Sequence, residues 1–324
     1  MTRQKKVYLF NSILIGMVLV KIQFMKNIFF VLITVVLASC SRNNLNNNPS
    51  DLYQDDGILP SSIMHDGGSR EYQLYIPPGY NGTDPLPVVI NFHGFDGDAY
   101  DYLINTSDMR SIASVESNPF FLVYPQAGYC DGGLAWNPCE LGGDNKCYFN
   151  DIDFIEALLD SLSIEFEIDS SRIYACGYSN GGMMAMGLGM KSDRFAAVGS
   201  VSGAMLDLET PSRPMPTIII HGTLDESLPY AGNSFYNSVQ SQIDFWVNVN
   251  NTDSIPLISS ETSPYGITTD HYRYLNGDND VSVEHYKIID GGHVWRMDQQ
   301  IYPAGKPDDD TGLILWEFFN RYSL

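Results

Sequence analysis

The chain has 324 residues, of which 44% are hydrophobic, and its formal net charge is −21. This hydrophobic content excludes a wholly disordered protein, and the length suits one large α/β domain or two smaller ones. The negative charge disfavours nucleic acid, anionic lipid surfaces and polyanionic substrates, so neutral substrates remain.

Residues 1–39 have the composition of a signal segment. No acidic residue precedes Cys40, whereas the stretch from Met25 to Cys40 combines a basic start, an apolar core and small residues before the cysteine. Met25 is therefore an alternative start of the protein. Membrane helices are the rival interpretation, but each apolar run is shorter than the about 20 residues that a span needs.

The sequence Leu37-Ala38-Ser39-Cys40 resembles the lipobox of bacterial lipoproteins, in which the cysteine is lipidated. This resemblance implies lipidation of Cys40 and export, with the protein lipid-anchored to a bacterial membrane or secreted. Residues 40–57 are polar and rich in asparagine, which favours a flexible tether. Residues 58–324 are then expected to form the folded domain.

Beyond the tether, predicted strands and helices alternate along the chain. Apolar and alternating runs predict strands at Glu71–Tyr80, Leu86–Gly94, Pro119–Gln126, Arg172–Cys176, Phe195–Gly203, Pro216–Gly222 and Val281–Ile289. Helices are predicted at Asp151–Leu162, from Met183 onward, at Ser234–Val249 and at Thr311–Tyr322. This alternation predicts an α/β fold with a mostly parallel, doubly wound sheet. Functional groups in such folds lie at the carboxyl ends of the strands.

Three cysteines, Cys130, Cys139 and Cys147, lie close together in a loop-like stretch. Because export permits disulfides, one bridge is expected, and we assign it to Cys139 and Cys147. A zinc site is the rival interpretation, but no histidine lies in that stretch. Cys176, within a predicted strand, is expected to be a small buried apolar residue.

The stretch Gly177-Tyr178-Ser179-Asn180-Gly181 has the G-x-S-x-G spacing between a predicted strand and a predicted helix. In such an elbow the chain reverses sharply and holds the serine in a strained conformation. Side chains at Gly177 or Gly181 would collide with the neighbouring strand or helix. The alternative is a tight turn built from small residues, with no catalytic role.

A serine nucleophile needs a base, and the base needs an orienting acid. Asp225 follows the apolar strand at Pro216–Gly222, and His293 follows the last strand after two glycines, which completes the chain order Ser179, Asp225, His293. Glu226 is the rival acid. Of the other histidines, His93 and His221 are expected to brace loops, His271 and His285 to face solvent, and His65 to precede the first strand.

An acyl-transfer site also needs donors for the oxyanion. The N–H of Asn180, directly after the serine, is one candidate. The second is expected in the loop after an early strand, and the N–H of Phe95 is our first choice. With these parts in register, Ser179 is predicted to attack a carbonyl.

These motifs together resemble the esterase family that groups poly(3-hydroxybutyrate) depolymerases with feruloyl and acetylxylan esterases. The resemblance extends from about Met64 to His293 and includes Trp136-Asn137, the elbow and the strand ends before Asp225 and His293. It implies an α/β-hydrolase fold in a single catalytic domain, the triad Ser179, Asp225 and His293, a carboxylic ester substrate, and no metal or cofactor. Two departures are the lack of a cysteine after Trp246 and the segment after His293.

Within this family, export suggests a feruloyl esterase that releases hydroxycinnamoyl groups from plant cell-wall polysaccharide. An acetylxylan esterase or a polyhydroxybutyrate depolymerase-like hydrolase is the alternative. Trp136, Tyr178 and Trp295 are candidates for stacking on an acyl or sugar ring, although they are equally expected as core aromatics. From a different class, a catalytically silent carbohydrate-binding lipoprotein is conceivable, and the intact triad argues against it.

Overall fold

The computed structural model describes residues 57–130, 132–139, 147–206, 208–263, 266–295 and 310–324. The predicted signal segment, lipidation site Cys40 and tether up to residue 56 lie outside the described residues. Residues Tyr53–Leu324 cluster as one compact unit. Within the described part of the chain, no helix has the length and hydropathy required to cross a membrane.

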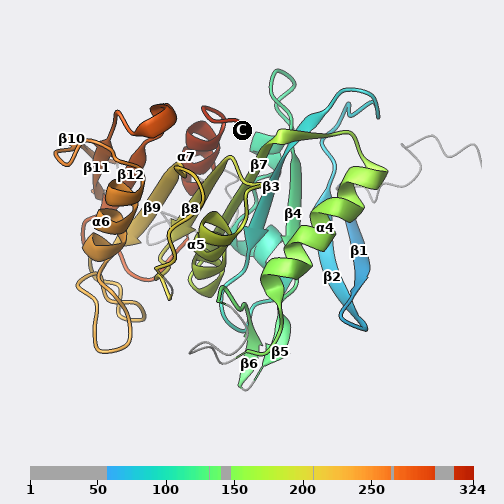
Figure 1. The fold of residues 1–324 in the computed structure, drawn as a ribbon, viewed down its shortest axis with the longest axis horizontal. Helices are drawn as coiled ribbons and strands as arrows, with labels where there is room; N and C mark the ends of the chain where they lie inside the picture. Colours follow the sequence, from blue (N-terminus) through green and yellow to red (C-terminus); the bar gives the residue numbers. More distant parts are fainter. Residues whose placement is uncertain (1–56, 131, 140–146, 207, 264–265, 296–309) are drawn as a thin grey trace, which may run out of the picture. The chain divides into compact units, whose positions relative to one another are not determined.

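A ten-stranded sheet forms the centre of this unit (Figure 1), in the spatial order β1-β2-β4-β3-β7-β8-β9-β12-β11-β10. The six strands from β4 to β12 are mutually parallel, and antiparallel strands extend both edges. The strands are β1 (Ile58–His65), β2 (Gly68–Tyr75), β3 (Leu86–Phe92), β4 (Phe121–Pro125), β7 (Ile168–Tyr178), β8 (Ala197–Val201), β9 (Thr217–Gly222), β10 (Leu257–Thr262), β11 (Thr268–Tyr274) and β12 (Val283–Ile288). A separate two-stranded ribbon joins β5 (Gly128–Cys130) to β6 (Gly133–Ala135).

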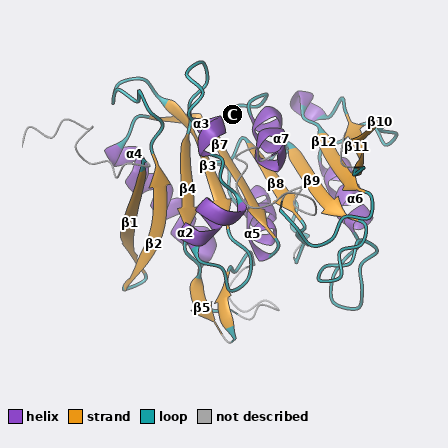
Figure 2. Cartoon of the chain, turned by 180° about the vertical axis from the view of Figure 1, so that it is seen from behind, coloured by secondary structure: helices purple, strands orange, loops and turns teal. Residues whose placement is uncertain are grey.

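Helices cover both faces of the sheet. In Figure 1 the near face carries α4 (Asp151–Glu165), α5 (Asn180–Lys191) and α6 (Val239–Val249). Seen from behind, in Figure 2, the other face carries α2 (Ala99–Asp101), α3 (Arg110–Ala113) and α7 (Asp310–Phe319). The shorter segments η2 (Tyr102–Thr106) and η3 (Asp278–Asp280) complete the described helices.

The two helical layers produce two hydrophobic clusters, one on each face. Along β9, Ile219 packs in the cluster with the α4, α5 and α6 side chains, whereas Ile218 and Ile220 pack in the cluster with α7. Successive strand residues point to opposite faces, so a strand covered on both sides must be apolar throughout. The predicted α/β class with a mostly parallel, doubly wound sheet is therefore confirmed.

The strand and helix boundaries differ from the prediction in informative places. Helix α5 begins at Asn180 rather than at the predicted Met183. Gly181 and Gly182 belong to its first turn, where close packing leaves no room for a side chain. His65 ends β1 instead of preceding the first strand. Strand β10 was not predicted because every one of its residues is exposed, so it carries no buried face to produce a pattern.

Candidate active site

Ser179 lies at the junction between β7 and α5, at the carboxyl end of the parallel strands. Its backbone has φ 55° and ψ −118°, a conformation that L residues rarely adopt. A Cβ added to Gly177 would lie 2.4 Å from the Gly181 carbonyl, and one added to Gly181 would lie 2.1 Å from Phe92 O. The predicted collisions are thus confirmed, and both glycines are needed where strand, elbow and helix approach each other.

Three side chains that are far apart in the sequence form one hydrogen-bonded row. His293 Nε2 is 3.0 Å from Ser179 Oγ, and His293 Nδ1 is 2.7 Å from Asp225 Oδ2. With Nδ1 donating to the carboxylate, Nε2 is left as the acceptor for the serine hydroxyl. The arrangement has the geometry in which a histidine can remove the serine proton.

Asp225 is buried and held from several directions. Its Oδ1 accepts the N–H groups of Ser227 and Leu228, at 2.9 and 2.8 Å. His221 Nε2 lies 2.9 Å from Leu228 O and 3.2 Å from Asp225 Oδ2, so its N–H is directed between these two acceptors. Burial raises the pKa of Asp225, but hydrogen bonds from His221 and His293 outweigh it and place the pKa well below its usual range. Asp225 is therefore ionised at neutral pH, as the orienting role requires.

The two predicted oxyanion donors belong to chain segments next to the serine. Asn180 is the first residue of α5, where backbone N–H groups have no partner within the helix. Phe95 follows Gly94, and a Cβ on Gly94 would lie 3.4 Å from Ser179 Cβ, so this loop passes close to the serine. Within the described part of the chain, no backbone carbonyl accepts the Phe95 N–H.

His93 braces the loop that carries Phe95. Burial lowers the pKa of His93 to about 4, so the ring is neutral. Its Nδ1 is 2.7 Å from Gly94 O, and its Nε2 is 3.1 Å from the Ala127 nitrogen, which donates to it. The bracing roles predicted for His93 and His221 are confirmed. His221 also contacts the carboxylate of Asp225, which was not predicted. The sequence signal for this contact is that both residues lie at or just after the end of the same strand.

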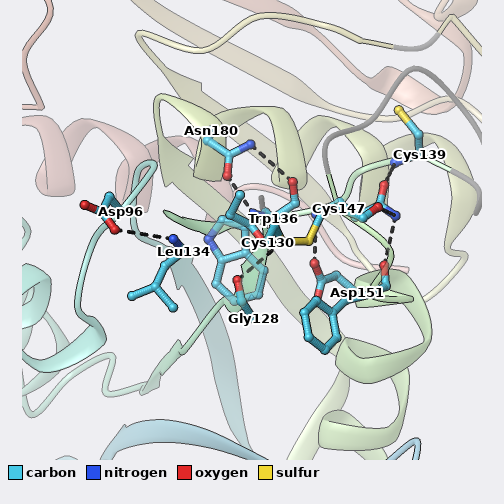
Figure 3. Close-up of a disulfide and its surroundings, with 12 residues drawn as sticks. Asp96, Gly128, Cys130, Leu134, Trp136, Cys139, Cys147, Asp151 and Asn180 are labelled. Carbon is cyan, nitrogen blue, oxygen red and sulfur yellow. Dashed lines mark hydrogen bonds between the residues drawn. A yellow bond between two sulfur atoms is a disulfide. The ribbon is translucent and has the colours of Figure 1, made fainter. Parts of the chain in front are cut away.

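The disulfide prediction was wrong. Cys147 is bonded to Cys130, not to Cys139 (Figure 3). The β5–β6 ribbon places the Cα of Cys130 5.0 Å from that of Cys147, whereas Cys139 lies in a turn where its N–H donates to Asn137 Oδ1. Because the bridge removes two of the three thiols, these cysteines do not supply a zinc site.

Two of the three proposed substrate-binding aromatics are core residues. Trp136 and Trp295 are 0% and 1% exposed, so neither presents a ring face to a substrate. Trp136 packs edge-on against Phe92, and Trp295 packs against Tyr102. Tyr178 is partly buried, and its hydroxyl donates to His293 O at 2.8 Å, which fixes the backbone of the histidine. Burial raises the pKa of Tyr178 to about 12.

His285 also differs from the prediction, because it is buried rather than facing solvent. Its Nδ1 is 3.0 Å from Ile219 O, and its Nε2 is 2.8 Å from the Tyr230 hydroxyl. Strand β12 is an inner strand between β9 and β11. The sheet face toward which His285 points is covered, so the side chain is buried there. His271 is partly buried, with Nε2 2.7 Å from Glu284 Oε2.

A group of potential metal ligands lies outside the row of Ser179, His293 and Asp225. His65, Asp66 and Asp153 are the one such group among the described residues, and both carboxylates are exposed. It belongs to the β1–β2 turn and the start of α4, and neither element contributes to the row of Ser179, Asp225 and His293.

Comparison with known proteins agrees with this architecture. A model of the esterase family matches residues 61–297. Among curated proteins, the chain is similar to the bifunctional acetylxylan esterase/xylanase of Neocallimastix patriciarum, with 24% identity over 80% of this chain and 34% of the relative. It is also similar to feruloyl esterase B of Piromyces equi, with 23% identity over 79% of this chain and 46% of the relative.

The chain therefore spans about a third to a half of the length of these two relatives. Among solved structures, the acetyl xylan esterase from Aspergillus awamori aligns with a TM-score of 0.57 at 15% identity, covering 81% of this chain and 99% of that one. This likeness establishes the common fold. Because the family model matches most of this chain, the chain belongs to the esterase family of α/β-hydrolases.

Proposed function

We propose that the protein hydrolyses carboxylic esters through an acyl-enzyme formed on Ser179. The observation that carries this proposal is the continuous row of hydrogen-bonding groups from Ser179 Oγ through His293 to Asp225. Family membership supports the same reaction class. A binding module without catalytic function would have no need for a strained serine aligned with a histidine and an ionised carboxylate.

In the proposed mechanism, Ser179 Oγ attacks the ester carbonyl while His293 Nε2 takes the hydroxyl proton. Asp225 stabilises the imidazolium that forms, and the N–H groups of Phe95 and Asn180 bind the oxyanion. His293 then returns the proton to the departing alcohol. A water molecule, activated by the same imidazole, hydrolyses the acyl-enzyme and restores Ser179.

We further propose a feruloyl ester of plant cell-wall polysaccharide as the preferred substrate class, with acetylated xylan as the alternative. The names of the two curated relatives support these two acyl groups. The negative charge of the chain is compatible with a neutral ester. With Trp136 and Trp295 buried, Phe95 is the better candidate for an aromatic contact, because its side chain is 52% exposed and it belongs to the oxyanion loop.

Export and attachment to a bacterial membrane through Cys40 are likewise part of the proposal. Their support is the sequence of residues 25–40, with its basic start, apolar core and terminal cysteine. Labelling of growing cells with a radioactive fatty acid tests this directly. Incorporation into the wild type and not into a Cys40→Ala variant is the expected result.

The activity is tested with the protein lacking residues 1–40, using Ser179→Ala as the blank. Values of kcat/KM for methyl ferulate and 4-nitrophenyl acetate are compared. Strong preference for methyl ferulate is expected, whereas activity on the acetate alone would assign the protein to the deacetylases. Absence of any Ser179-dependent rate, together with no labelling by a serine-reactive phosphonate, would favour the carbohydrate-binding alternative.

A further inference from the structure

The segment from Leu134 to Trp136 lies between the two parts of the chain that carry the proposed oxyanion donors. One part is the loop containing Phe95, and the other is the start of α5 with Asn180. In Figure 3, Leu134 lies toward Asp96 and the backbone of Trp136 lies toward the Asn180 side chain. Hydrogen bonds connect the segment to both parts.

Toward the Phe95 loop, Leu134 makes two hydrogen bonds with Asp96, the residue that follows Phe95. Asp96 N–H donates to Leu134 O at 2.7 Å, and Leu134 N–H donates to Asp96 Oδ1 at 3.4 Å. Asp96 has φ 56°, a left-handed conformation that is costly for a residue with a Cβ. The two bonds to Leu134 stabilise this conformation in the residue directly after Phe95.

Toward α5, Trp136 makes a matching pair of bonds with the Asn180 side chain. Trp136 N–H donates to Asn180 Oδ1 at 2.7 Å, and Asn180 Nδ2–H donates to Trp136 O at 3.3 Å. The indole Nε1–H of Trp136 donates to His93 O at 3.0 Å, back on the first loop. Trp136 therefore contacts both sides of the predicted oxyanion site.

The segment is itself anchored at both ends. Before it, Cys130 in β5 is bonded to Cys147. After it, Asn137 N–H donates to Asp151 Oδ2 at 2.8 Å. Asp151 is fully buried, and Arg70 donates to its other oxygen at 2.6 Å. A buried pair with this geometry fixes the position of the chain, because each partner is costly to leave unpaired.

We propose that Leu134–Trp136 is a positioning element that sets the separation and direction of the Phe95 and Asn180 N–H groups. The Asn180 side chain and the Trp136 indole are its positioning residues, and the Cys130–Cys147 bridge holds the segment in place. This inference rests on the proposed ester hydrolysis, since it assigns a role in stabilising the oxyanion.

A positioning role predicts a specific kinetic signature. The oxyanion donors act on charge that develops only in the transition state. Displacing them therefore lowers kcat and weakens binding of a tetrahedral analogue, whereas KM for the planar ester is little changed. If the role were purely structural, the substitutions would lower the melting temperature and leave kcat and the binding of the tetrahedral analogue unchanged.

The first test is Asn180→Ala, which keeps the backbone N–H and removes both bonds to Trp136. Its matched control is Asn250→Ala. Asn250 is 0% exposed and makes the same pair of bonds, each 2.7 Å, with the backbone of Met215, just before the amino end of β9. Each variant loses a pair of hydrogen bonds between an asparagine side chain and a distant backbone, but only the pair made by Asn180 lies at the site.

The full-length protein and its variants are assayed with 4-nitrophenyl acetate and inhibited with an alkyl trifluoromethyl ketone, which forms a tetrahedral adduct on serine. For Asn180→Ala, kcat is expected to fall about ten- to a hundredfold, since a displacement of about 1 Å costs about 10²-fold. The inhibition constant rises by a similar factor, and KM stays within about twofold. Asn250→Ala retains the wild-type kcat and inhibition constant.

Trp136→Phe is the second variant, because it keeps a smaller aromatic ring at this buried position and removes the indole N–H that donates to His93 O. This variant is expected to lower kcat severalfold, to raise the inhibition constant by a similar factor and to leave KM little changed. It tests the proposal even if Asn180→Ala is too unstable to assay. Wild-type kcat and inhibition in the folded variants would overturn the positioning role while leaving ester hydrolysis intact. If the wild type shows no Ser179-dependent rate, the proposed function fails and this inference fails with it.

Discussion

Gly181→Ala tests whether the elbow depends on close backbone packing. At most helix positions, replacing glycine with alanine stabilises the helix by about 1 kcal/mol. At Gly181, however, the new Cβ would lie 2.1 Å from Phe92 O and 2.6 Å from His93 O. Both atoms belong to the backbone, so neither can rotate away from the contact.

Relief of this contact has a calculable size. An ordinary van der Waals contact begins at 3.4 Å, so the start of α5 and the end of β3 must separate by about 1.3 Å. Overpacking costs about 1–3 kcal/mol, and the gain in helix propensity leaves a net loss of about 1 kcal/mol. For a domain of this size the melting temperature should fall by about 2–4 °C.

The effect on activity should exceed the effect on stability. Because β3 leads into the loop of Phe95, the separation moves the two proposed oxyanion donors apart. A misplacement of about 1 Å costs about 10²-fold in rate. We therefore expect kcat for 4-nitrophenyl acetate to fall about 10²-fold, measured together with the thermal melt of each variant.

The matched control is Gly68→Ala, where the new Cβ would meet only His65 O, at 3.9 Å. This variant should retain the wild-type kcat. If Gly181→Ala also turned over at the wild-type rate and melted at the wild-type temperature, the requirement for glycine at the elbow would be refuted.

Three further predictions concern the acid, the bridge and pH. Asp225→Asn should lower kcat by about 10⁴-fold, because the amide favours the wrong tautomer of the catalytic imidazole; steady-state kinetics at pH 7 measure this. Replacing Cys130 and Cys147 with serine should reduce the free energy of unfolding by about 3 kcal/mol, since the bridge spans 17 residues; urea titration is the assay, and an unchanged midpoint would contradict it. Burial raises the pKa of Glu284, but the hydrogen bond from His271 and the ion pair with Arg321 together outweigh this, and the pKa is lowered. Its stabilising contribution is therefore present above about pH 4.5 and lost as the pH falls further, so the difference in unfolding free energy between the wild type and Glu284→Gln should shrink in acid.

The sequence alone determined the fold class and the residues that meet at the site. Buried strands carry continuous apolar runs, and parallel strands align their carboxyl ends, so a residue just past each strand end is placed at one edge. For this reason Ser179 and His293, which are 114 positions apart, could be paired before their contact was seen. The elbow could be predicted because Gly177 and Gly181 lie two residues before and two residues after Ser179.

Only the tertiary structure decided which side chains are buried and which cysteines pair. Trp295 and His285 sit in stretches whose local pattern fits either a solvent-facing or a covered position, and the packing of neighbouring elements made both of them core residues. The partner of Cys147 depends on how the β5–β6 ribbon folds back, and that ribbon is too short to leave a periodic signal. The bonds from Trp136 to both sides of the site are likewise contacts between distant segments, which no local pattern encodes.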